Sequence, residues 1–437
     1  MKRLIKSLAL PLFLVILCLI GSFTPVEATK TKKINGETVL ELPIYRKNHP
    51  VQALFEYAKR RGLDVGNNQA NETKFLQRLY KKIGVSGVKN ESIALFKTFD
   101  SDFYTKIGVG HPARSANFLI DTSWSDSWMI GTNCTEWACR FKQKYNATFS
   151  NTSHVDGRAF DINLGDGIFG GNITGNLAID TVVFAHYNAS RVTFASVDNI
   201  PWFMAFTNYS GILGFGKATK RMGGAQPIWK TLLRQNKIKK ALFALYFNRD
   251  PTVPRAGALL LGAADPHHYN ATAAEEVEVN DRSLWSFKIR DLIFSYVKKK
   301  KKRVPVLHFC ENACEVLLDS GGNSITGPKD QIDKINDLIG ALPFFFGFKR
   351  VPCENLAKLP ELVFTFGSKE IILYGEHYIQ QIYYEGYVLC LSTFVPMVPQ
   401  VDSKFTWTFG VPVLSKYYTI YDADKNTVTI SDYKTHS

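Results

Sequence analysis

The chain has 437 residues, of which 45% are hydrophobic and 21% are charged. This composition is that of an ordinary globular protein, and the length allows more than one hydrophobic core. The formal net charge of +14 is concentrated in residues 30–82 and in the run 298–303. For that run an anionic partner and a solvated hairpin tip are the two interpretations, and we favour the tip. No nucleic-acid-binding module accompanies the charge, which argues against a nucleic-acid partner.

The first 28 residues are typical of a secretory signal peptide. Met1–Lys6 is basic, residues 8–23 form an apolar run, and Ala28 ends a segment suited to signal-peptidase cleavage. A membrane anchor is the alternative, but the run is short for a span and stops before Pro25. No later stretch is apolar for long enough to cross a bilayer. We therefore expect a secreted or lysosomal protein with no membrane span in its mature form.

Asn-x-Ser/Thr sequons support the same compartment, because they are glycosylated only along the secretory route. Nine occur in the sequence, and we expect them to give an extensively glycosylated surface. They are Asn71, Asn90, Asn133, Asn146, Asn151, Asn172, Asn188, Asn208 and Asn270.

Cysteine usage also fits an oxidising compartment. Of seven cysteines, Cys18 lies in the signal segment, and the other six permit fifteen disulfide pairings. The short separations favour two local loops and leave one longer pair: Cys134–Cys139, Cys310–Cys314 and Cys353–Cys390. No CxxC pair or suitably spaced His pair accompanies them, so we expect no zinc site, no other metal and no cofactor.

The chain contains two regions that differ in composition and in hydrophobic periodicity. Residues 29–95 are cationic, lack cysteine and show helical periodicity at 51–61 and 73–84. From about Tyr104 the chain consists of short runs rich in β-branched and aromatic residues, separated by turn residues, which predicts an all-β body. The expected strands include 104–110, 117–121, 127–131, 180–185, 191–197, 258–263, 286–294, 362–366, 370–374, 417–422 and 427–432, with helices at 227–238 and 328–341.

One phrase occurs twice in this body. In "NFLIDTSWSDSW" (117–128) and in "VLLDSGGNSITGP" (316–328), an aspartate follows an apolar run and precedes small polar residues. An aspartate after a strand is common in turns, so each phrase alone is weak evidence. If the two halves bring Asp121 and Asp319 together, the carboxyl groups share one proton. One can then act as base toward a water while the other polarises a carbonyl, which is peptide hydrolysis without a metal.

The residues around both phrases are more specific. A Tyr-led strand and Ile-Gly-Val-Gly precede Asp121, and a cysteine loop, Asp-Ser-Gly, Thr-Gly-Pro and a helix surround Asp319. Residues 171–184, 209–216 and 407–432 add a hairpin, a glycine-rich turn and closing strands. Together these segments resemble the pepsin-like aspartic peptidases, of the pepsin and cathepsin D type, from about Tyr104 to near the end of the chain.

The resemblance implies an all-β fold with two lobes, each a β-barrel, and an active site in the cleft between them. The N-terminal lobe would span 96–265 and the C-terminal lobe 266–437. Residues 29–95 would form a basic prosegment that inhibits the enzyme intramolecularly, with 39–47 as its first strand. The expected protein is a monomeric endopeptidase zymogen that acts on polypeptides. The three cysteine pairs are also the family's pattern.

The resemblance also assigns roles to single residues. Asp121 and Asp319 would form the catalytic dyad. Thr122, Ser320 and Gly321 would support it, and Trp128 would lie behind the flap, the hairpin of residues 171–184. The tyrosine that the family carries in this flap is missing here, and Leu164 or Ile168 stands at its place.

Further departures lie next to the aspartates. Ser123 stands where the family has glycine, Trp124 replaces a small hydroxyl residue, and Gly322 replaces another. These changes predict crowding at Asp121 and the loss of one hydroxyl partner from each aspartate. Two hypotheses therefore remain: an acid-active aspartic endopeptidase, which we favour, and a catalytically silent homologue that binds peptides or a secreted partner.

Overall fold

The computed structural model describes residues 30–47, 49–61, 78, 103–164, 170–184, 187–217, 225–249, 253, 255–280, 284–298, 302–344, 347–384, 387–397 and 406–434. The expected signal peptide, Ile168, Asn71, Asn90 and the predicted helix 73–84 (apart from Arg78) lie outside this part. Strands dominate the described residues and the helices are short, which confirms the predicted all-β class.

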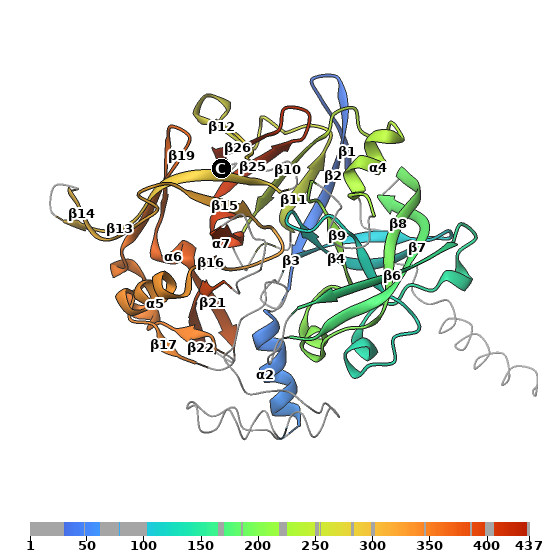
Figure 1. Ribbon diagram of the computed structural model, residues 1–437, viewed down its shortest axis with the longest axis horizontal. Helices are drawn as coiled ribbons and strands as arrows, with labels where there is room; N and C mark the ends of the chain where they lie inside the picture. The colour runs from blue at the N-terminus through green and yellow to red at the C-terminus, as the bar shows by residue number, and fades with distance from the viewer. Residues whose placement is uncertain are drawn as a thin grey trace, which may run out of the picture.

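The N-terminal lobe is a closed β-barrel (Figure 1). The ring closes because one strand, β3 (Phe103–Val109), pairs on one side with β4 (Arg114–Asp121) and on the other with β7 (Asn172–Phe184). The hairpin strand β6 (His154–Asn163) continues the sheet beyond β7. The six strands of the ring are β3 (Phe103–Val109), β4 (Arg114–Asp121), β9 (Gly211–Gly214), β5 (Trp128–Ile130), β8 (Tyr187–Asn199) and β7 (Asn172–Phe184). The helical segments of this lobe are η1 (Trp137–Phe141), η2 (Ala147–Phe149), η3 (Trp202–Phe206) and α4 (Ile228–Arg234).

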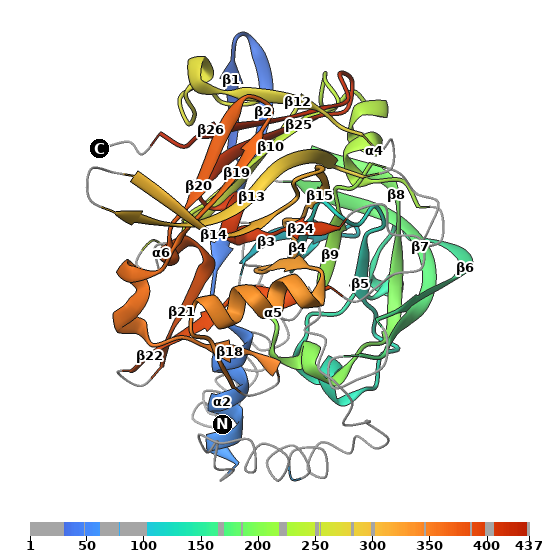
Figure 2. The ribbon, with the colours of Figure 1, turned by 60° about the vertical axis from the view of Figure 1, so that its left-hand side comes forward.

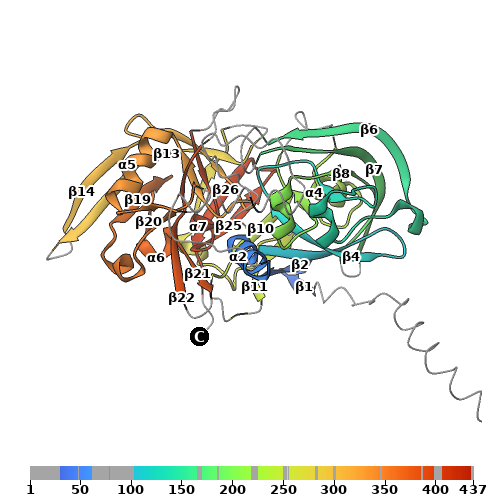
Figure 3. The same ribbon diagram turned by 90° about the horizontal axis from the view of Figure 1, so that it is seen from below.

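The barrel continues into a sheet that joins the two lobes. Its order from the edge is β12 (Glu275–Glu278), β26 (Thr427–Asp432), β25 (Tyr417–Asp422), β10 (Leu242–Phe247), β11 (Arg255–Leu261) and β2 (Glu37–Arg46). Strand β2 lies between β11 and β3, so a segment from before the body joins the sheet to the barrel. β1 (Lys30–Ile34) folds back on β2 as a hairpin, drawn in blue in Figure 2. Helix α2 (Pro50–Arg60) follows β2 and lies between the lobes in Figure 3.

The C-terminal lobe holds the remaining strands. One sheet runs β20 (Lys369–Leu373), β19 (Glu361–Phe366), β13 (Ser286–Lys298), β15 (Cys314–Leu318), β24 (Trp407–Phe409), β16 (Ile325–Gly327) and β23 (Phe394–Pro396), with β14 (Lys302–Phe309) paired to β13. A smaller sheet contains β17 (Leu342–Pro343), β18 (Lys349–Arg350), β22 (Tyr387–Ser392) and β21 (Ile379–Tyr384). The helical segments are η4 (Ala271–Ala273), α5 (Lys329–Leu338), η7 (Cys353–Lys358), α6 (Gly375–Tyr378) and α7 (Val411–Leu414).

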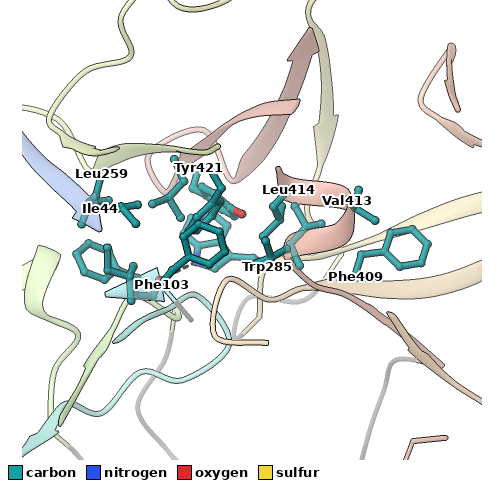
Figure 4. Close-up of a cluster of buried hydrophobic side chains, with 14 of the residues drawn as sticks. Ile44, Phe103, Leu259, Trp285, Phe409, Val413, Leu414 and Tyr421 are labelled. Carbon is teal, nitrogen blue, oxygen red and sulfur yellow. Dashed lines mark hydrogen bonds between the residues drawn. The ribbon is translucent and has the colours of Figure 1, made fainter. Parts of the chain in front are cut away.

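A continuous hydrophobic core crosses the junction of the lobes. Figure 4 shows Ile44 of β2 beside Phe103, Leu259 and the aromatic pair Trp285 and Tyr421. Alternate residues of β2 enter this core because successive side chains of a strand point to opposite faces. The indole N–H of Trp285 donates to the carbonyl of Phe215 at 2.8 Å, so the polar atom of this buried ring is satisfied across the lobes.

The predicted elements agree well with the described ones. Each expected strand overlaps an observed strand, and the helices expected at 51–61, 227–238 and 328–341 correspond to α2, α4 and α5. The six cysteines of the body form the three expected disulfides. None of the sequon asparagines in the described residues is buried. In that same part of the chain, no helix is long and apolar enough to span a bilayer.

Candidate active site

The two aspartates lie at equivalent points of the two lobes. Asp121 ends β4, which runs parallel to β9, and its carbonyl accepts from the N–H of Phe215 at 2.8 Å. Asp319 directly follows β15, which runs parallel to β24, and its N–H donates to the carbonyl of Phe409 at 3.0 Å. Both side chains are buried, with 0% and 1% of their surface exposed. Each lobe therefore presents one carboxyl group at the end of an inner parallel strand pair.

Reciprocal hydrogen bonds hold the two turns together. The N–H of Thr122 donates to Ser320 Oγ at 3.1 Å, and the N–H of Ser320 donates to Thr122 Oγ1 at 3.0 Å. Each hydroxyl also donates across the junction, from Thr122 to the Leu318 carbonyl at 3.0 Å and from Ser320 to the Ile120 carbonyl at 2.7 Å. All four bonds are buried. The residues that follow the aspartates thus form one interlocked unit with approximate two-fold symmetry.

Gly321 lies against both carboxyl groups. Its N–H donates to Asp319 Oδ1 at 3.0 Å. A Cβ atom built on Gly321 would lie 2.6 Å from Cγ of Asp121, well inside van der Waals contact. The side chain of Asp121 therefore reaches the turn of the opposite lobe, and glycine is required there because no larger residue fits.

Hydrogen bonds to Asp121 correct one prediction. We expected the replacements at Ser123 and Trp124 to remove the hydroxyl partner of this carboxylate, but Ser123 itself supplies one. Asp121 Oδ1 accepts from the N–H of Ser123 at 2.7 Å, from the N–H of Trp124 at 3.1 Å and from the hydroxyl of Ser123. Ser123 does not adopt a left-handed backbone conformation, so a side chain causes no backbone strain at this position. The indole of Trp124 packs against an apolar cluster.

That cluster joins the flap region to helix α2, and we call it the interlobe apolar cluster. Trp128 and Leu164, 1% and 8% exposed, belong to it, and the N–H of Leu164 donates to the carbonyl of Gly171 at 2.9 Å. Among the described residues, the buried indole nitrogen of Trp128 has no hydrogen-bond partner. Leu164 cannot provide a hydrogen-bond partner for this nitrogen, because the leucine side chain has no polar atom. The other members of the interlobe apolar cluster include Val51, Leu54, Phe55, Ala58, Phe160, Ile162, Phe203, Phe206, Ile212, Phe348, Ile382 and Leu391.

Helix α2 contributes one face to this cluster. His49 caps its N-terminus by accepting from the N–H of Val51 at 3.2 Å, and Pro50 suits the first turn. The buried positions Val51, Leu54, Phe55 and Ala58 recur with helical spacing. The ring of Phe55 meets Phe344 of the C-terminal lobe edge-on at 6.3 Å. The helix therefore packs against the flap region and both lobes at once.

Charged groups anchor the strand that precedes the helix. Lys32 lies 2.5 Å from Glu41 within the hairpin and 2.5 Å from Asp265 of the body, and Arg255 pairs with Glu41. Burial opposes ionisation of Asp265, but the bonds from Lys32 and from the N–H of His267 outweigh it and hold the pKa of Asp265 below its ordinary value. This contribution to hairpin binding is present near neutral pH and is lost as pH falls through the lowered pKa.

Asp126 is a residue that sequence reasoning did not single out. It lies five residues after Asp121 and is fully buried. Burial raises the pKa of Asp126 to about 7, although the N–H of Ala225 and the positive charge of Arg158 partly oppose the rise. The sequence did carry a signal for it, because Asp126 is an acidic residue in a turn that otherwise contains small and aromatic residues.

No group of three or more metal-ligating side chains occurs in the described part of the chain.

Comparisons with known proteins agree with this geometry. The family model for eukaryotic aspartyl proteases matches residues 102–433. Cathepsin D of Chionodraco hamatus is 29% identical over 338 residues, which cover 75% of this chain and 80% of the relative. Cathepsin D of Gallus gallus is 27% identical over 379 residues, covering 86% and 92%, and that of Homo sapiens is 28% identical over 348 residues, covering 76% and 81%. Since the family model spans most of the sequence, the chain belongs to the eukaryotic aspartyl protease family.

Proposed function

We propose that this protein is an aspartic endopeptidase in which Asp121 and Asp319 activate one water molecule for attack on a peptide bond. The observation that carries the proposal is the interlocked pair of turns. Four buried hydrogen bonds between Thr122, Ser320 and the strand ends hold two carboxyl groups at one junction of the lobes. Fixed placement of catalytic groups is what such chemistry requires, because it removes the entropy cost of assembling them.

The chemistry follows from two carboxyl groups that share one proton. The ionised group takes a proton from water as the water oxygen bonds to the carbonyl carbon, and the protonated group gives its proton to the carbonyl oxygen. When the tetrahedral intermediate collapses, the C–N bond breaks and the leaving nitrogen takes a proton from one carboxyl group, while a hydroxyl of the intermediate gives its proton to the other as the new C=O bond forms. The carboxyl groups return to their starting state, and no covalent intermediate with the protein forms.

The segment before the body fits the role of an inhibitory prosegment within 29–95. Strand β2 is part of the interlobe sheet, and α2 fills the interlobe apolar cluster beside the flap region. A polypeptide substrate would have to displace α2 to reach the same side chains. Acid protonates Asp265 and so weakens its ion pair with Lys32, and acidification therefore favours release of the prosegment from the body. We propose that the chain is made as a zymogen.

The cellular setting is part of the same proposal. The signal-like residues 1–28, the sequons and the three disulfides are consistent with a glycosylated protein that is secreted or delivered to lysosomes. We expect a monomer whose prosegment acts as an intramolecular inhibitor.

A second candidate is a catalytically silent homologue that binds peptides or a secreted partner. The observation that favours it is at the flap: Leu164, one of the two candidates for the place of the family's tyrosine, carries no hydroxyl, and Trp128 keeps a buried indole N–H without a partner in the described residues. A leucine at this place lacks a donor that could bind substrate.

Acidification of the purified zymogen tests both candidates. The protein is brought below pH 3.8, where protonation of Asp265 begins to weaken its pair with Lys32, and is offered a denatured protein substrate. Cleavage that a pepstatin-type inhibitor blocks, and that Asp319→Asn abolishes, supports the peptidase. Absence of cleavage by the wild type after removal of residues 29–95, with peptide binding retained, supports the silent homologue.

A further inference from the structure

We propose that Ser123 is a positioning residue for Asp121. Its hydroxyl and its backbone N–H together hold one carboxylate oxygen, so that the other oxygen faces the opposite turn. This inference rests on the peptidase function proposed above and extends it to a residue whose type departs from the family's glycine at this position.

The geometry at Asp121 Oδ1 is the first step. This oxygen accepts three hydrogen bonds, from the N–H and hydroxyl of Ser123 and from the N–H of Trp124. Rotation of an aspartate carboxyl group about its last side-chain bond is soft, because that torsion has broad wells. Three donors gathered on one oxygen remove this freedom. Ser123 provides two of them, and its hydroxyl is the one donor of the three that a substitution can remove.

The position of the second oxygen is the next step. Asp121 Oδ2 is buried and has no hydrogen-bond partner among the described residues. It faces Gly321, whose N–H bonds to Asp319 Oδ1 at 3.0 Å. With Oδ1 occupied, Oδ2 is the oxygen of Asp121 that is available to exchange a proton with the reacting groups. Its direction depends on what holds Oδ1.

Other hydroxyl groups of the turn cannot take this role. The Thr122 hydroxyl donates to the Leu318 carbonyl and is committed to the junction of the turns. The side chain of Trp124 packs against the interlobe apolar cluster and carries no hydroxyl. No hydrogen bond joins the Ser125 hydroxyl to either aspartate in the described residues. Ser123 is therefore the hydroxyl that Asp121 uses.

Three variants of the full chain, activated by acid, test the inference. Ser123→Ala removes only the hydroxyl, Ser123→Thr keeps it, and Ser125→Ala is the matched control two residues along the turn. We expect Ser123→Ala to lower kcat about tenfold, as the loss of a hydrogen bond to a charged group does, with little change in KM. The acid limb of its pH–rate profile should move to higher pH, because the lost bond stabilised the ionised carboxylate.

The outcomes separate this inference from the proposed function. Restoration of kcat and of the acid limb by Ser123→Thr, with Ser125→Ala like wild type, supports the positioning role. A wild type that cleaves substrate and a Ser123→Ala variant with the same kcat and pH profile would overturn it while the peptidase stands.

A second readout serves if the wild type does not cleave. Carboxyl carbons of aspartate are labelled with carbon-13, and the Asp121 resonance is assigned by its loss in Asp121→Asn. At one fixed pH we expect this resonance to move from its wild-type position in Ser123→Ala and to stay near it in Ser123→Thr, because only the alanine variant loses the hydroxyl bond to Oδ1. An unchanged resonance in Ser123→Ala would reject the role of Ser123, whatever the protein's activity.

Discussion

The turns after Asp121 and Asp319 follow the same path but differ in what they tolerate. In the second turn Gly321 touches the carboxyl group of the opposite lobe, and nothing larger fits. In the first turn the corresponding residue is Ser123, whose side chain turns back to its own aspartate. Three residues further along, buried Asp126 corresponds to Ser324. A repeated motif therefore does not carry equal constraints: each position is limited by what it faces across the junction.

Replacement of Gly321 by serine is expected to have the largest effect on activity. Gly321→Ser would give the second turn the residue of the first, but its Cβ would press on Asp121. We expect at least a hundredfold loss of kcat/KM, since displacement of a catalytic group by about 1 Å costs that much. The reverse exchange, Ser123→Gly, should cost only about tenfold. Activity assays on both variants measure the difference, and equal losses would contradict the asymmetry.

The reciprocal hydrogen bonds test the shared part of the two turns. Thr122→Val and Ser320→Ala each remove one hydroxyl and leave buried backbone groups without their partner. We expect each to lower the free energy of unfolding by about 1–3 kcal/mol, because unsatisfied buried groups carry that cost. Urea unfolding measures both. A loss confined to one variant would mean that one turn alone stabilises the junction.

Asp126 gives the first turn a pH dependence that the second lacks. Its pKa of about 7 in the folded protein is above the ordinary value, so between about pH 4 and 7 the unfolded chain gives up a proton that the folded chain keeps. This contribution to stability is therefore full below pH 4 and declines as pH rises to about 7. Asp126→Asn should raise the free energy of unfolding at pH 8 by on the order of 1–3 kcal/mol and leave it unchanged at pH 3.5.

Urea unfolding of Asp126→Asn at the two pH values checks this prediction. Ser324→Ala, the corresponding position of the second turn, is the control and should show the same difference from wild type at both pH values. If Asp126→Asn also behaved the same at pH 8 and pH 3.5, ionisation of Asp126 would not be the cause of the pH dependence.

Much of the architecture could be predicted from the sequence, because alternation in the strands and the repeated aspartate phrase are local patterns. The expectation that Asp121 loses its hydroxyl partner was wrong for a physical reason. The prediction compared residue types position by position, whereas the side chain of Ser123 turns back to the carboxylate that a hydroxyl at position 124 was expected to serve. The pKa of Asp126 likewise depends on the N–H of Ala225 and the charge of Arg158, which are distant in sequence.

A substitution in the flap region has the smallest expected effect on kcat/KM, and its outcome distinguishes an active protein from a silent one. The first turn leads into Trp128, whose buried indole N–H lacks a partner in the described residues, whereas the second leads to Thr326 at the corresponding place. Leu164→Tyr adds a hydroxyl in the same apolar cluster, and one new hydrogen bond of about 1 kcal/mol would raise kcat/KM about fivefold. Leu164→Phe is the matched control, because it adds the ring without the hydroxyl. A gain in the tyrosine variant alone means that the dyad is competent and that the flap limits the rate, whereas equal gains in both would assign the effect to ring packing.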